Sequence, residues 1–324
     1  MRKVLLSQEI NPEGRKILEG KFEIVVAPDT SQETLMKKAK DVDAIILRTT
    51  SKVTKEVIEN APKLRIISRT GAGVDNVDVN AATEKGILVC NLPAVNSLSV
   101  SEHAIAMILH LAKQLSVMDR AVRNGNWKVR SLNLPIELDG KVLGIVGMGN
   151  IGSLVAKKCH DGFGMKILAY DPYVKERFKD FDYTFTDSLE TLFKESDFIT
   201  LHLPNMPETN GIITKDLIFS MKKSAYLINA ARGGVIDEKA LIDALKEKRI
   251  AGAGLDVFQI EPPNLDNELL KLENVILSPH SAALTKEAST RMAIEAAQAV
   301  VDYFEGRQPK YIYNYKFLKD RGFI

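Results

Sequence analysis

Short apolar runs alternate with amphipathic segments along most of the chain. In the first ninety residues the runs lie at 4–6, 23–26, 44–47, 65–68 and 87–90, with helical patterns between them at 12–19, 32–39, 55–60 and 79–85. From residue 143 the alternation resumes, with apolar runs at 143–147, 167–170, 198–203, 225–229, 252–257 and 275–277. This order is typical of parallel sheets joined by crossover helices. The sequence therefore predicts an α/β fold with two doubly wound parallel-sheet domains.

Two longer helical patterns flank the second set of strands. One runs from Ser99 towards Arg123 and carries more apolar positions than one buried stripe requires, and Ser99 and Glu102 have the spacing of a capping box. The other covers residues 286–304. We expect one domain from residues 1–97 plus 287–324 and another from residues 98–286. The two apolar faces of the 99–123 helix favour contact with a second subunit, and burial within one chain is the alternative.

A glycine motif lies near the start of the second set of strands. Gly147, Gly149 and Gly152 follow an apolar run and open a helical segment, and Asp171 ends the next apolar run nineteen residues after Gly152. The glycines permit a tight turn, close approach of a pyrophosphate and close helix packing, and the helix N-terminus favours phosphate. Asp171 can accept hydrogen bonds from ribose hydroxyls and would repel a 2′-phosphate. The motif predicts NAD rather than NADP, and a purely structural turn is the alternative.

The charge balance and the cysteine count argue against several other classes of protein. With 44 basic and 42 acidic residues the formal net charge is +2, and no basic patch indicates nucleic-acid binding. Cys90 and Cys159 are too isolated for a disulfide framework or a zinc site. The five histidines lack metal-ligand spacing, and we interpret His103 and His110 as packing residues of one helix. These residues lead us to expect no metal site. The sequence shows no signal peptide or membrane-spanning run, so we expect a cytoplasmic protein.

Three predicted strand ends carry groups suited to hydride-transfer chemistry. Arg232 follows one strand, Glu261 follows the next, and His280 follows the last. Open α/β sheets bind ligands at the carboxyl ends of their strands. A guanidinium can grip a carboxylate through two hydrogen bonds, a histidine can exchange a proton near neutral pH, and a glutamate would favour its protonated form. Each residue alone could be an ordinary surface group, but their shared position favours a site.

These motifs together resemble the D-isomer-specific 2-hydroxyacid dehydrogenase family, and within it the phosphoglycerate-dehydrogenase-like branch. The similarity extends over nearly the whole chain, with matching motifs at residues 69–78, 96–97, 147–152, 170–172, 232–234, 256–263 and 279–280. The resemblance implies a Rossmann NAD domain inserted into a flavodoxin-like substrate domain. It also implies an enzyme that transfers a hydride between NAD(H) and a D-2-hydroxy acid or 2-oxo acid, and a homodimer formed through the 99–123 helix.

The family's functional residues map onto positions of this sequence. The resemblance implies that Arg232 binds the substrate carboxylate and carbonyl, that His280 is the general acid and base, and that Glu261 pairs with it. Its cofactor contacts map to Gly147, Gly149, Asn150, Ile151, Gly152, Asp171, Leu203, Pro204, Thr209, Ala230, Ala231, Arg232, Asp256 and His280. Its substrate contacts map to Arg48, Arg69, Ala72, Gly73, Asn96 and Arg232.

The choice of substrate depends on the first domain. Arg48 and Arg69 end adjacent predicted strands, and the resemblance makes them candidates for a second anionic group such as a phosphate, with local ion pairing as the alternative. We expect 3-phosphoglycerate or phosphohydroxypyruvate, in serine biosynthesis, with hydroxypyruvate, glyoxylate or another 2-oxo acid as alternatives. Residues 279–285 depart from the Gly-Gly-Ser or Gly-Ala-Ser run of that branch, which leaves the substrate open. Arg130, which follows Trp127, is a further candidate that would come from a neighbouring subunit, and the sequence does not decide whether it reaches the site.

The sequence also allows alternatives to a 2-hydroxyacid dehydrogenase. Some proteins of this fold are NAD-sensing corepressors that keep the catalytic residues, so the motifs alone do not exclude a binding protein. A phosphite- or formate-oxidising relative is disfavoured by the paired arginines Arg48 and Arg69. Because the sequence stops at Ile324, we expect an enzyme without the C-terminal regulatory domains of longer phosphoglycerate dehydrogenases.

Overall fold

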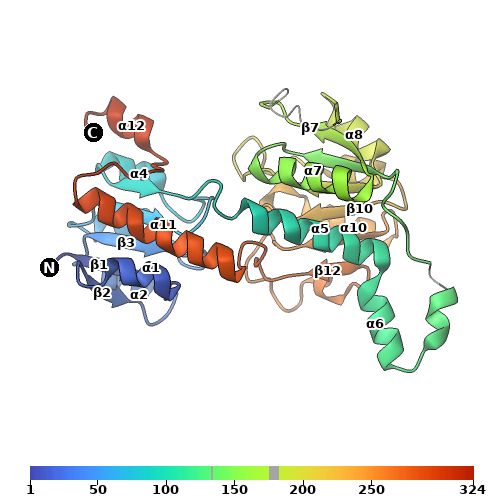
Figure 1. The fold of residues 1–324 in the computed structure, drawn as a ribbon, viewed down its shortest axis with the longest axis horizontal. Helices are drawn as coiled ribbons and strands as arrows, with labels where there is room; N and C mark the ends of the chain where they lie inside the picture. Colours follow the sequence, from blue (N-terminus) through green and yellow to red (C-terminus); the bar gives the residue numbers. More distant parts are fainter. Residues whose placement is uncertain (133, 175–181) are drawn as a thin grey trace. The chain divides into compact units, whose positions relative to one another are not determined.

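The protein forms two compact units, each built around one parallel sheet. The structure, a computed structural model, describes residues 1–132, 134–174 and 182–324. Unit 1 consists of Met1–Asn96 and Leu284–Ile324, and unit 2 consists of Ser97–Ala283 (Figure 1). Within each unit helices pack on both faces of the sheet, so the predicted fold class is confirmed.

The sheet of unit 1 has five parallel strands in the order β2-β1-β3-β4-β5. This is the strand order of flavodoxin-like folds. Its central strands are rich in Ile, Leu and Val and are buried on both faces, as parallel sheets require. The strands are β1 (Lys3–Leu6), β2 (Glu23–Val26), β3 (Ala44–Leu47), β4 (Ile66–Arg69) and β5 (Leu88–Cys90).

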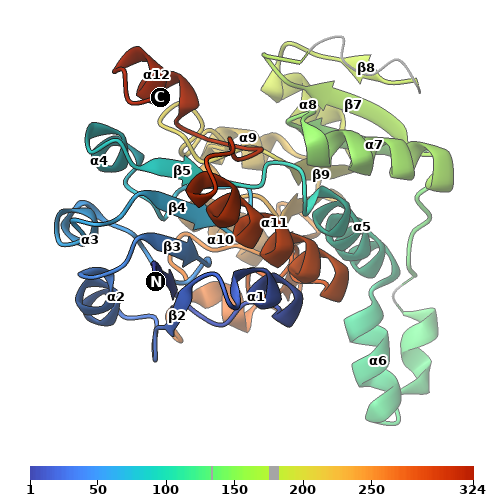
Figure 2. The same ribbon diagram turned by 60° about the vertical axis from the view of Figure 1, so that its left-hand side comes forward.

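Helices cover both faces of this sheet. The helices are α1 (Pro12–Leu18), α2 (Gln32–Ala39), α3 (Lys55–Glu59), α4 (Val79–Glu84), α11 (Lys286–Phe304) and α12 (Tyr315–Asp320). Residues of α2, α3 and α4 share one core with the strands, and α1 and α11 lie side by side on the other face (Figures 1 and 2). A Cβ atom at Gly14 would lie 2.5 Å from the carbonyl carbon of Ala293. Glycine therefore lets the two helix backbones touch.

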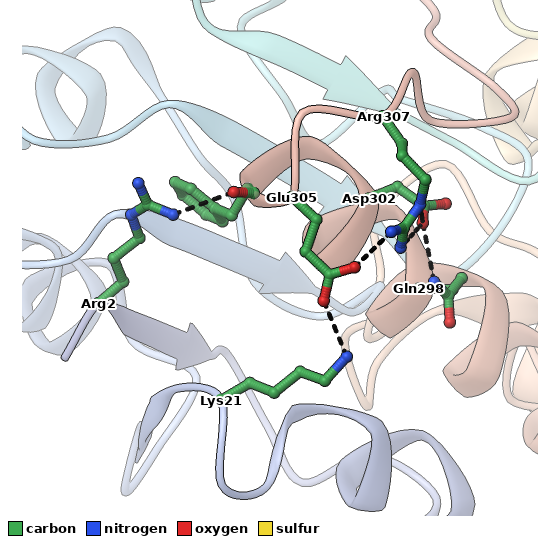
Figure 3. Close-up of polar contacts among 7 residues, drawn as sticks. Arg2, Lys21, Gln298, Asp302, Glu305 and Arg307 are labelled. Carbon is green, nitrogen blue, oxygen red and sulfur yellow. Dashed lines mark hydrogen bonds and ion pairs between the residues drawn. The ribbon is translucent and has the colours of Figure 1, made fainter.

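Charged residues gather where α11 ends, as Figure 3 shows. Arg2 donates to the Phe304 carbonyl oxygen at 3.2 Å, and its guanidinium lies 4.6 Å from the centre of the Phe304 ring. Lys21 pairs with Glu305 at 3.0 Å, and Arg307 pairs with both Glu305 and Asp302. Basic groups at a helix C-terminus complement its dipole, although ion pairs as exposed as these contribute little to stability.

The C-terminal segment packs onto the edge strand β5. The Tyr313 N–H donates to the Val89 carbonyl oxygen at 2.7 Å, and the Val89 N–H donates to the Asn314 side-chain oxygen at 2.9 Å. The fully buried Asn314 amide also donates to Ile87 and Thr83. These contacts satisfy backbone groups that an edge strand would otherwise expose.

The sheet of unit 2 follows the Rossmann order. Within the described residues its seven parallel strands lie in the order β12-β11-β10-β9-β6-β7-β8. The chain leaves β6 towards β7 on one side and later returns to β9 on the other. Sheets with such a reversal of strand order typically bind ligands outside the carboxyl ends of these strands. The strands are β6 (Val142–Val146), β7 (Lys166–Tyr170), β8 (Thr184–Phe185), β9 (Phe198–Leu201), β10 (Tyr226–Asn229), β11 (Gly252–Leu255) and β12 (Val275–Leu277).

Two layers of helices enclose this sheet. Residues of α5 and α7 share one core with the strands, and α8, α9 and α10 form the core of the other face. Short 3-10 helices follow several strands. The elements are α5 (Ser97–Lys113), α6 (Leu115–Arg123), α7 (Asn150–Phe163), α8 (Leu189–Glu195), α9 (Lys215–Ser220), α10 (Glu238–Lys246), η1 (Trp127–Ser131), η2 (Gly233–Val235) and η3 (Glu268–Lys271).

The predicted continuous helix from Ser99 to Arg123 is wrong. Helix α5 begins two residues before Ser99, so the capping-box interpretation is wrong as well. The helix ends at Lys113, and Gln114 takes a left-handed conformation with φ of 52° before α6 begins. The apolar residues of α5 are buried in unit 2, whereas α6 buries no side chain and projects from the unit (Figure 1).

Candidate active site

Each glycine of the motif after β6 meets a different steric demand. Gly147 has φ of 97°, and a Cβ there would lie 2.7 Å from the His202 carbonyl oxygen. A Cβ at Gly152 would lie 1.9 Å from the Gly147 carbonyl oxygen, so α7 packs against the turn only through a glycine. A Cβ at Gly149 would meet no atom within 4 Å. The chain itself therefore does not require a glycine at this position, which agrees with space for a ligand.

The N-terminus of α7 has the properties of a phosphate site. Gly149 is the N-cap residue, and no side chain caps the helix. The first N–H groups of a helix lack partners within the helix, and its dipole favours an anion there. Asn150 and Ile151 form the first turn, with Asn150 exposed and Ile151 half-buried. The open space beside Gly149 and this uncapped terminus fit the pyrophosphate of a dinucleotide.

Asp171 lies immediately after β7 and is held by backbone groups. One carboxylate oxygen accepts from the Met148 N–H of the glycine turn at 2.8 Å. The other accepts from the N–H groups of Tyr173 at 2.8 Å and Val174 at 3.1 Å. The carboxylate therefore has a fixed position beside the glycine turn, where it can also accept from ribose hydroxyls.

The other predicted cofactor residues lie after β9 and β10. Thr209 is buried, and its hydroxyl donates to the Pro204 carbonyl oxygen at 2.6 Å and accepts from the Met206 N–H at 2.9 Å. These bonds close the loop that begins at Leu203 and Pro204. Ala230 and Ala231, which follow β10, are also buried.

His202 also lines this edge of the sheet and is missing from the predicted site. Its N–H donates to the Val146 carbonyl oxygen at 2.8 Å, which joins the ends of β9 and β6. Burial lowers the pKa of His202 to about 3, so its ring is neutral. Its Nε2 lies 3.0 Å from the Thr200 hydroxyl. The signal for this residue is its place directly after a buried strand that adjoins the glycine-motif strand.

The loop after β10 positions Arg232. The buried Asn229 amide donates to the Arg232 carbonyl oxygen at 2.9 Å and accepts from the Ala231 N–H at 3.0 Å. The Arg232 guanidinium donates to the Ala231 carbonyl oxygen at 2.8 Å. A Cβ at Gly233 would lie 1.9 Å from the Phe258 carbonyl oxygen. Glycine therefore lets this loop pack directly on the one that leads to the predicted glutamate.

His280 and Glu261 form a close pair. His280 Nδ1 lies 2.6 Å from Glu261 Oε2, and the other carboxylate oxygen accepts from the Phe258 N–H at 3.1 Å. Partial burial alone would raise the pKa of Glu261, but the hydrogen bond and charge of His280, the Phe258 N–H and the charge of Arg232 together lower it. The Glu261 carboxylate is therefore ionised throughout the neutral pH range and can accept a hydrogen bond from Nδ1 of the His280 ring.

The backbone of His280 is held in an uncommon conformation. Its φ is 50°, a left-handed value that costs a non-glycine residue about 1–2 kcal/mol. The His280 N–H donates to the Asp256 carbonyl oxygen at 2.7 Å. The buried Asp256 carboxylate accepts from the N–H groups of Ser281 at 2.8 Å and Ala282 at 3.0 Å. Asp256 is thus hydrogen-bonded to His280 through its carbonyl and to the next two residues through its carboxylate.

Unit 1 carries the predicted anion-binding arginines. Arg48 and Arg69 lie at the carboxyl ends of the paired strands β3 and β4. Arg48 donates to the Glu9 carbonyl oxygen at 2.9 Å, so it binds a neutral local acceptor there. Arg69 is buried and donates to the Thr70 carbonyl oxygen at 2.9 Å and the Thr49 hydroxyl at 3.1 Å. A Cβ at Gly71 would coincide with the Arg69 guanidinium, so glycine leaves room for this arginine.

The loop after β4 holds the predicted backbone donors. The Asn91 amide donates to the Ala72 carbonyl oxygen at 2.7 Å, and the Leu92 N–H donates to the Gly71 carbonyl oxygen at 2.8 Å. These contacts fix the loop that contains Ala72 and Gly73. Asn96 is buried, and its side-chain oxygen has no hydrogen-bond partner among the described residues.

Comparisons with known proteins identify close relatives. A family model described as D-isomer specific 2-hydroxyacid dehydrogenase, NAD binding domain, matches residues 105–282. The chain is 43% identical to D-3-phosphoglycerate dehydrogenase from Methanocaldococcus jannaschii, over 97% of this chain and 60% of that protein. It is 41% identical to glyoxylate reductase from Korarchaeum cryptofilum, over 98% of each. The chain thus spans about 60% of the length of the first of these relatives and nearly all of the second.

A solved structure extends this similarity to three dimensions. D-lactate dehydrogenase from Aquifex aeolicus, in complex with NAD and lactic acid, matches with a TM-score of 0.86 and 34% identity. The match covers 94% of this chain and 96% of that one.

None of the helices in the described residues combines the length and apolar character needed to cross a membrane. These residues also contain no group of three or more His, Cys, Asp or Glu side chains arranged to hold a metal ion.

The steric roles of the glycines predict opposite effects of two valine substitutions. We expect Gly149→Val to leave the melting temperature near that of the wild type and to raise the Kd for NADH at least about tenfold, because the added side chain fills only ligand space. Gly152→Val should lower the stability by about 1–3 kcal/mol or more, because its Cβ meets backbone. Thermal melts and NADH fluorescence titrations measure both effects. Normal NADH binding by a folded Gly149→Val variant would contradict the assignment.

Proposed function

Because the chain belongs to the D-isomer specific 2-hydroxyacid dehydrogenase family and carries its NAD-binding domain, we propose that it transfers a hydride between NAD(H) and a D-2-hydroxy acid or its 2-oxo acid. The observation that carries this proposal is the 2.6 Å pair of His280 and Glu261. This pair lies in the same unit as a glycine turn, an uncapped helix N-terminus and a fixed acidic residue that fit a dinucleotide.

The residues of unit 2 suit proton transfer and carboxylate binding. NAD(H), when bound, supplies or accepts the hydride. In the reductive direction the protonated His280 ring donates its proton to the oxygen of the 2-oxo group, and in oxidation the neutral ring accepts it. Glu261 holds the His280 ring at Nδ1, which leaves Nε2 as the reacting nitrogen. Arg232 binds the substrate carboxylate and stabilises the oxygen as it gains negative charge.

We propose 3-phosphoglycerate and phosphohydroxypyruvate as the preferred substrate pair, which would make the enzyme part of serine biosynthesis. The support is the position of Arg48 and Arg69 at the carboxyl ends of β3 and β4 and the similarity to D-3-phosphoglycerate dehydrogenases. The N–H groups of Ala72 and Gly73 and the Asn96 amide are proposed to bind the substrate carboxylate. An unphosphorylated 2-oxo acid is the second candidate, since the glyoxylate reductase relative matches over its whole length.

We further propose a homodimer formed through α6 and η1. The expected interface on the whole 99–123 helix does not fit its buried half, because Ile105 and Ile108 belong to the core of unit 2. By contrast α6 buries none of its residues, and this segment exposes Leu115, Val122, Trp127, Leu132 and Leu134. Several large exposed apolar residues on one segment support a protein–protein contact. Arg130 stacks on the Trp127 ring at 5.9 Å and belongs to the same surface.

The proposed proton transfer predicts the effects of two substitutions. His280→Asn should lower kcat by about 10²- to 10⁴-fold with NADH binding kept, because it removes the general acid. Glu261→Gln should lower kcat less, because Gln keeps a side-chain oxygen that can accept from Nδ1 of the His280 ring but loses the carboxylate charge. Steady-state rates across pH and NADH titrations test both. Unchanged turnover by His280→Asn would contradict the mechanism.

The substrate proposal predicts a selective loss. With NADH, the wild type should reduce phosphohydroxypyruvate in preference to hydroxypyruvate, glyoxylate and pyruvate. Arg48→Gln should raise KM for the phosphorylated substrate about tenfold or more, through loss of a charged hydrogen bond, and leave KM for glyoxylate unchanged. Arg65→Gln is the control, because Arg65 precedes β4 at the opposite end of the strand. Equal KM changes for both substrates would contradict a phosphate contact and favour the glyoxylate-type activity.

The interface proposal predicts a change in molecular mass. The double variant Leu115→Glu with Val122→Glu should convert the dimer to a monomer, because two carboxylates would enter an apolar contact. Leu265→Glu is the control, since Leu265 is 92% exposed and lies far from α6 in the sequence. Light scattering coupled to size exclusion measures the mass, and circular dichroism checks the fold. A folded double variant that stays dimeric would place the interface elsewhere.

A further inference from the structure

A chain of hydrogen bonds links α5 to the turn that presents His280. His103 Nε2, on α5, lies 2.9 Å from the Ser278 hydroxyl oxygen, and that hydroxyl lies 2.6 Å from Asp256 Oδ1. Asp256 Oδ1 also accepts from the Ser281 N–H, and Oδ2 accepts from the Ala282 N–H. The sequence predicts a packing residue at His103, whereas in the structure its ring makes a polar contact with Ser278.

The donors and acceptors of this chain fix the proton positions. A carboxylate only accepts hydrogen bonds, so the single hydroxyl proton of Ser278 is donated to Asp256. The Ser278 oxygen must then accept from His103, which requires a proton on His103 Nε2. The contact between His103 Nε2 and Asp256 Oδ1, at 3.7 Å, brings the same N–H close to the carboxylate. Each hydrogen bond of the chain is therefore donated in the direction from the His103 ring to the buried Asp256 carboxylate.

We propose that His103 and Ser278 are positioning residues for His280, acting through Asp256. The inference rests on the proposed function of His280 as the general acid and base. Asp256 accepts from the His280 N–H through its carbonyl and from the two residues after His280 through its carboxylate. A carboxylate that rotates would therefore move the turn that keeps His280 in its left-handed conformation. Ser278, held by His103, donates to the same carboxylate oxygen that accepts from the Ser281 N–H, and this second bond opposes that rotation.

Exposure separates this role from simple packing. The His103 side chain keeps 27% of its surface accessible, whereas the Asp256 side chain is 1% exposed. Loss of the His103 contact would leave the Ser278 hydroxyl without its donor and loosen the carboxylate. The effect would fall on the alignment of His280 more than on the stability of the core, because no buried apolar group is removed.

The test compares disruptive and conservative variants of both residues. We expect His103→Leu and Ser278→Ala each to lower kcat about tenfold or more with melting temperatures near the wild type. The double variant should be no worse than the more impaired single one, because both break one chain. His103→Gln and Ser278→Thr, which keep a side-chain donor and a hydroxyl, should recover most of the rate. His110→Leu is the control on the same helix, since the hydrogen-bond partner of His110 in the described part of the chain is Ser116 at the start of α6.

A readout without turnover separates this inference from the proposed function. In long-range proton–nitrogen spectra of the histidine rings, His103 should carry its proton on Nε2, and Ser278→Ala should shift the ring signals of His103 and His280. His110→Leu should leave both unchanged. A wild type that reduces no 2-oxo acid would refute the proposed function while these spectra still test the hydrogen-bond chain. Additive losses of rate, losses that only follow a lower melting temperature, or unchanged His280 signals would overturn the inference.

Discussion

The buried carboxylate of Asp256 is the group on which the proposed catalytic geometry of unit 2 depends. A buried charge is unfavourable unless hydrogen bonds satisfy it, and here the hydroxyl of Ser278 and two backbone N–H groups do so. Those donors come from the segment after β12, while Asp256 itself follows β11. The need to satisfy one charge therefore joins two strand ends and sets the turn that holds His280. The sequence resemblance assigns Asp256 to the cofactor, and its contacts within the chain add a second, structural reason for an acid at this position.

Much of the fold could be predicted because it depends on local patterns. The structure has the predicted strands at 44–47 and 275–277 and the predicted helix at 286–304. A continuous apolar run and a 3.6-residue period are both patterns of neighbouring residues, so they can be recognised in the sequence. The glycine turn was also predictable, because its demands arise within a few residues of the chain. The short strand β8 was missed, as two residues are too few to form a pattern. The break at Gln114 was missed because glutamine is an ordinary helix residue and its left-handed conformation depends on surrounding structure.

The candidate site was predictable as a set of residues but not as a set of contacts. Arg232, Glu261 and His280 could be chosen by chemistry and by their place after strands, because parallel strands bring their carboxyl ends to one edge. The 2.6 Å distance between His280 and Glu261 depends on how two loops pack, which no sequence period encodes. The same holds for His103, whose partner Ser278 is 175 residues away. A lone histidine on an apolar helix gives no signal that distinguishes a packing residue from a hydrogen-bonded one.

In both units, hydrogen bonds within the chain hold the side chains of the candidate arginines in place. Arg48 and Arg232 each donate to a backbone carbonyl, and Arg69 donates to a carbonyl and a hydroxyl. Gly71 leaves room for the Arg69 guanidinium, and Gly233 lets the Arg232 loop pack on its neighbour. An arginine held in this way loses less side-chain entropy when it binds an anion, so more of each charged hydrogen bond contributes to affinity. Under the proposed function, the fixed guanidinium groups within each unit favour acids whose anionic groups they can reach without reorienting, since a fixed group adapts poorly to an acid of different length.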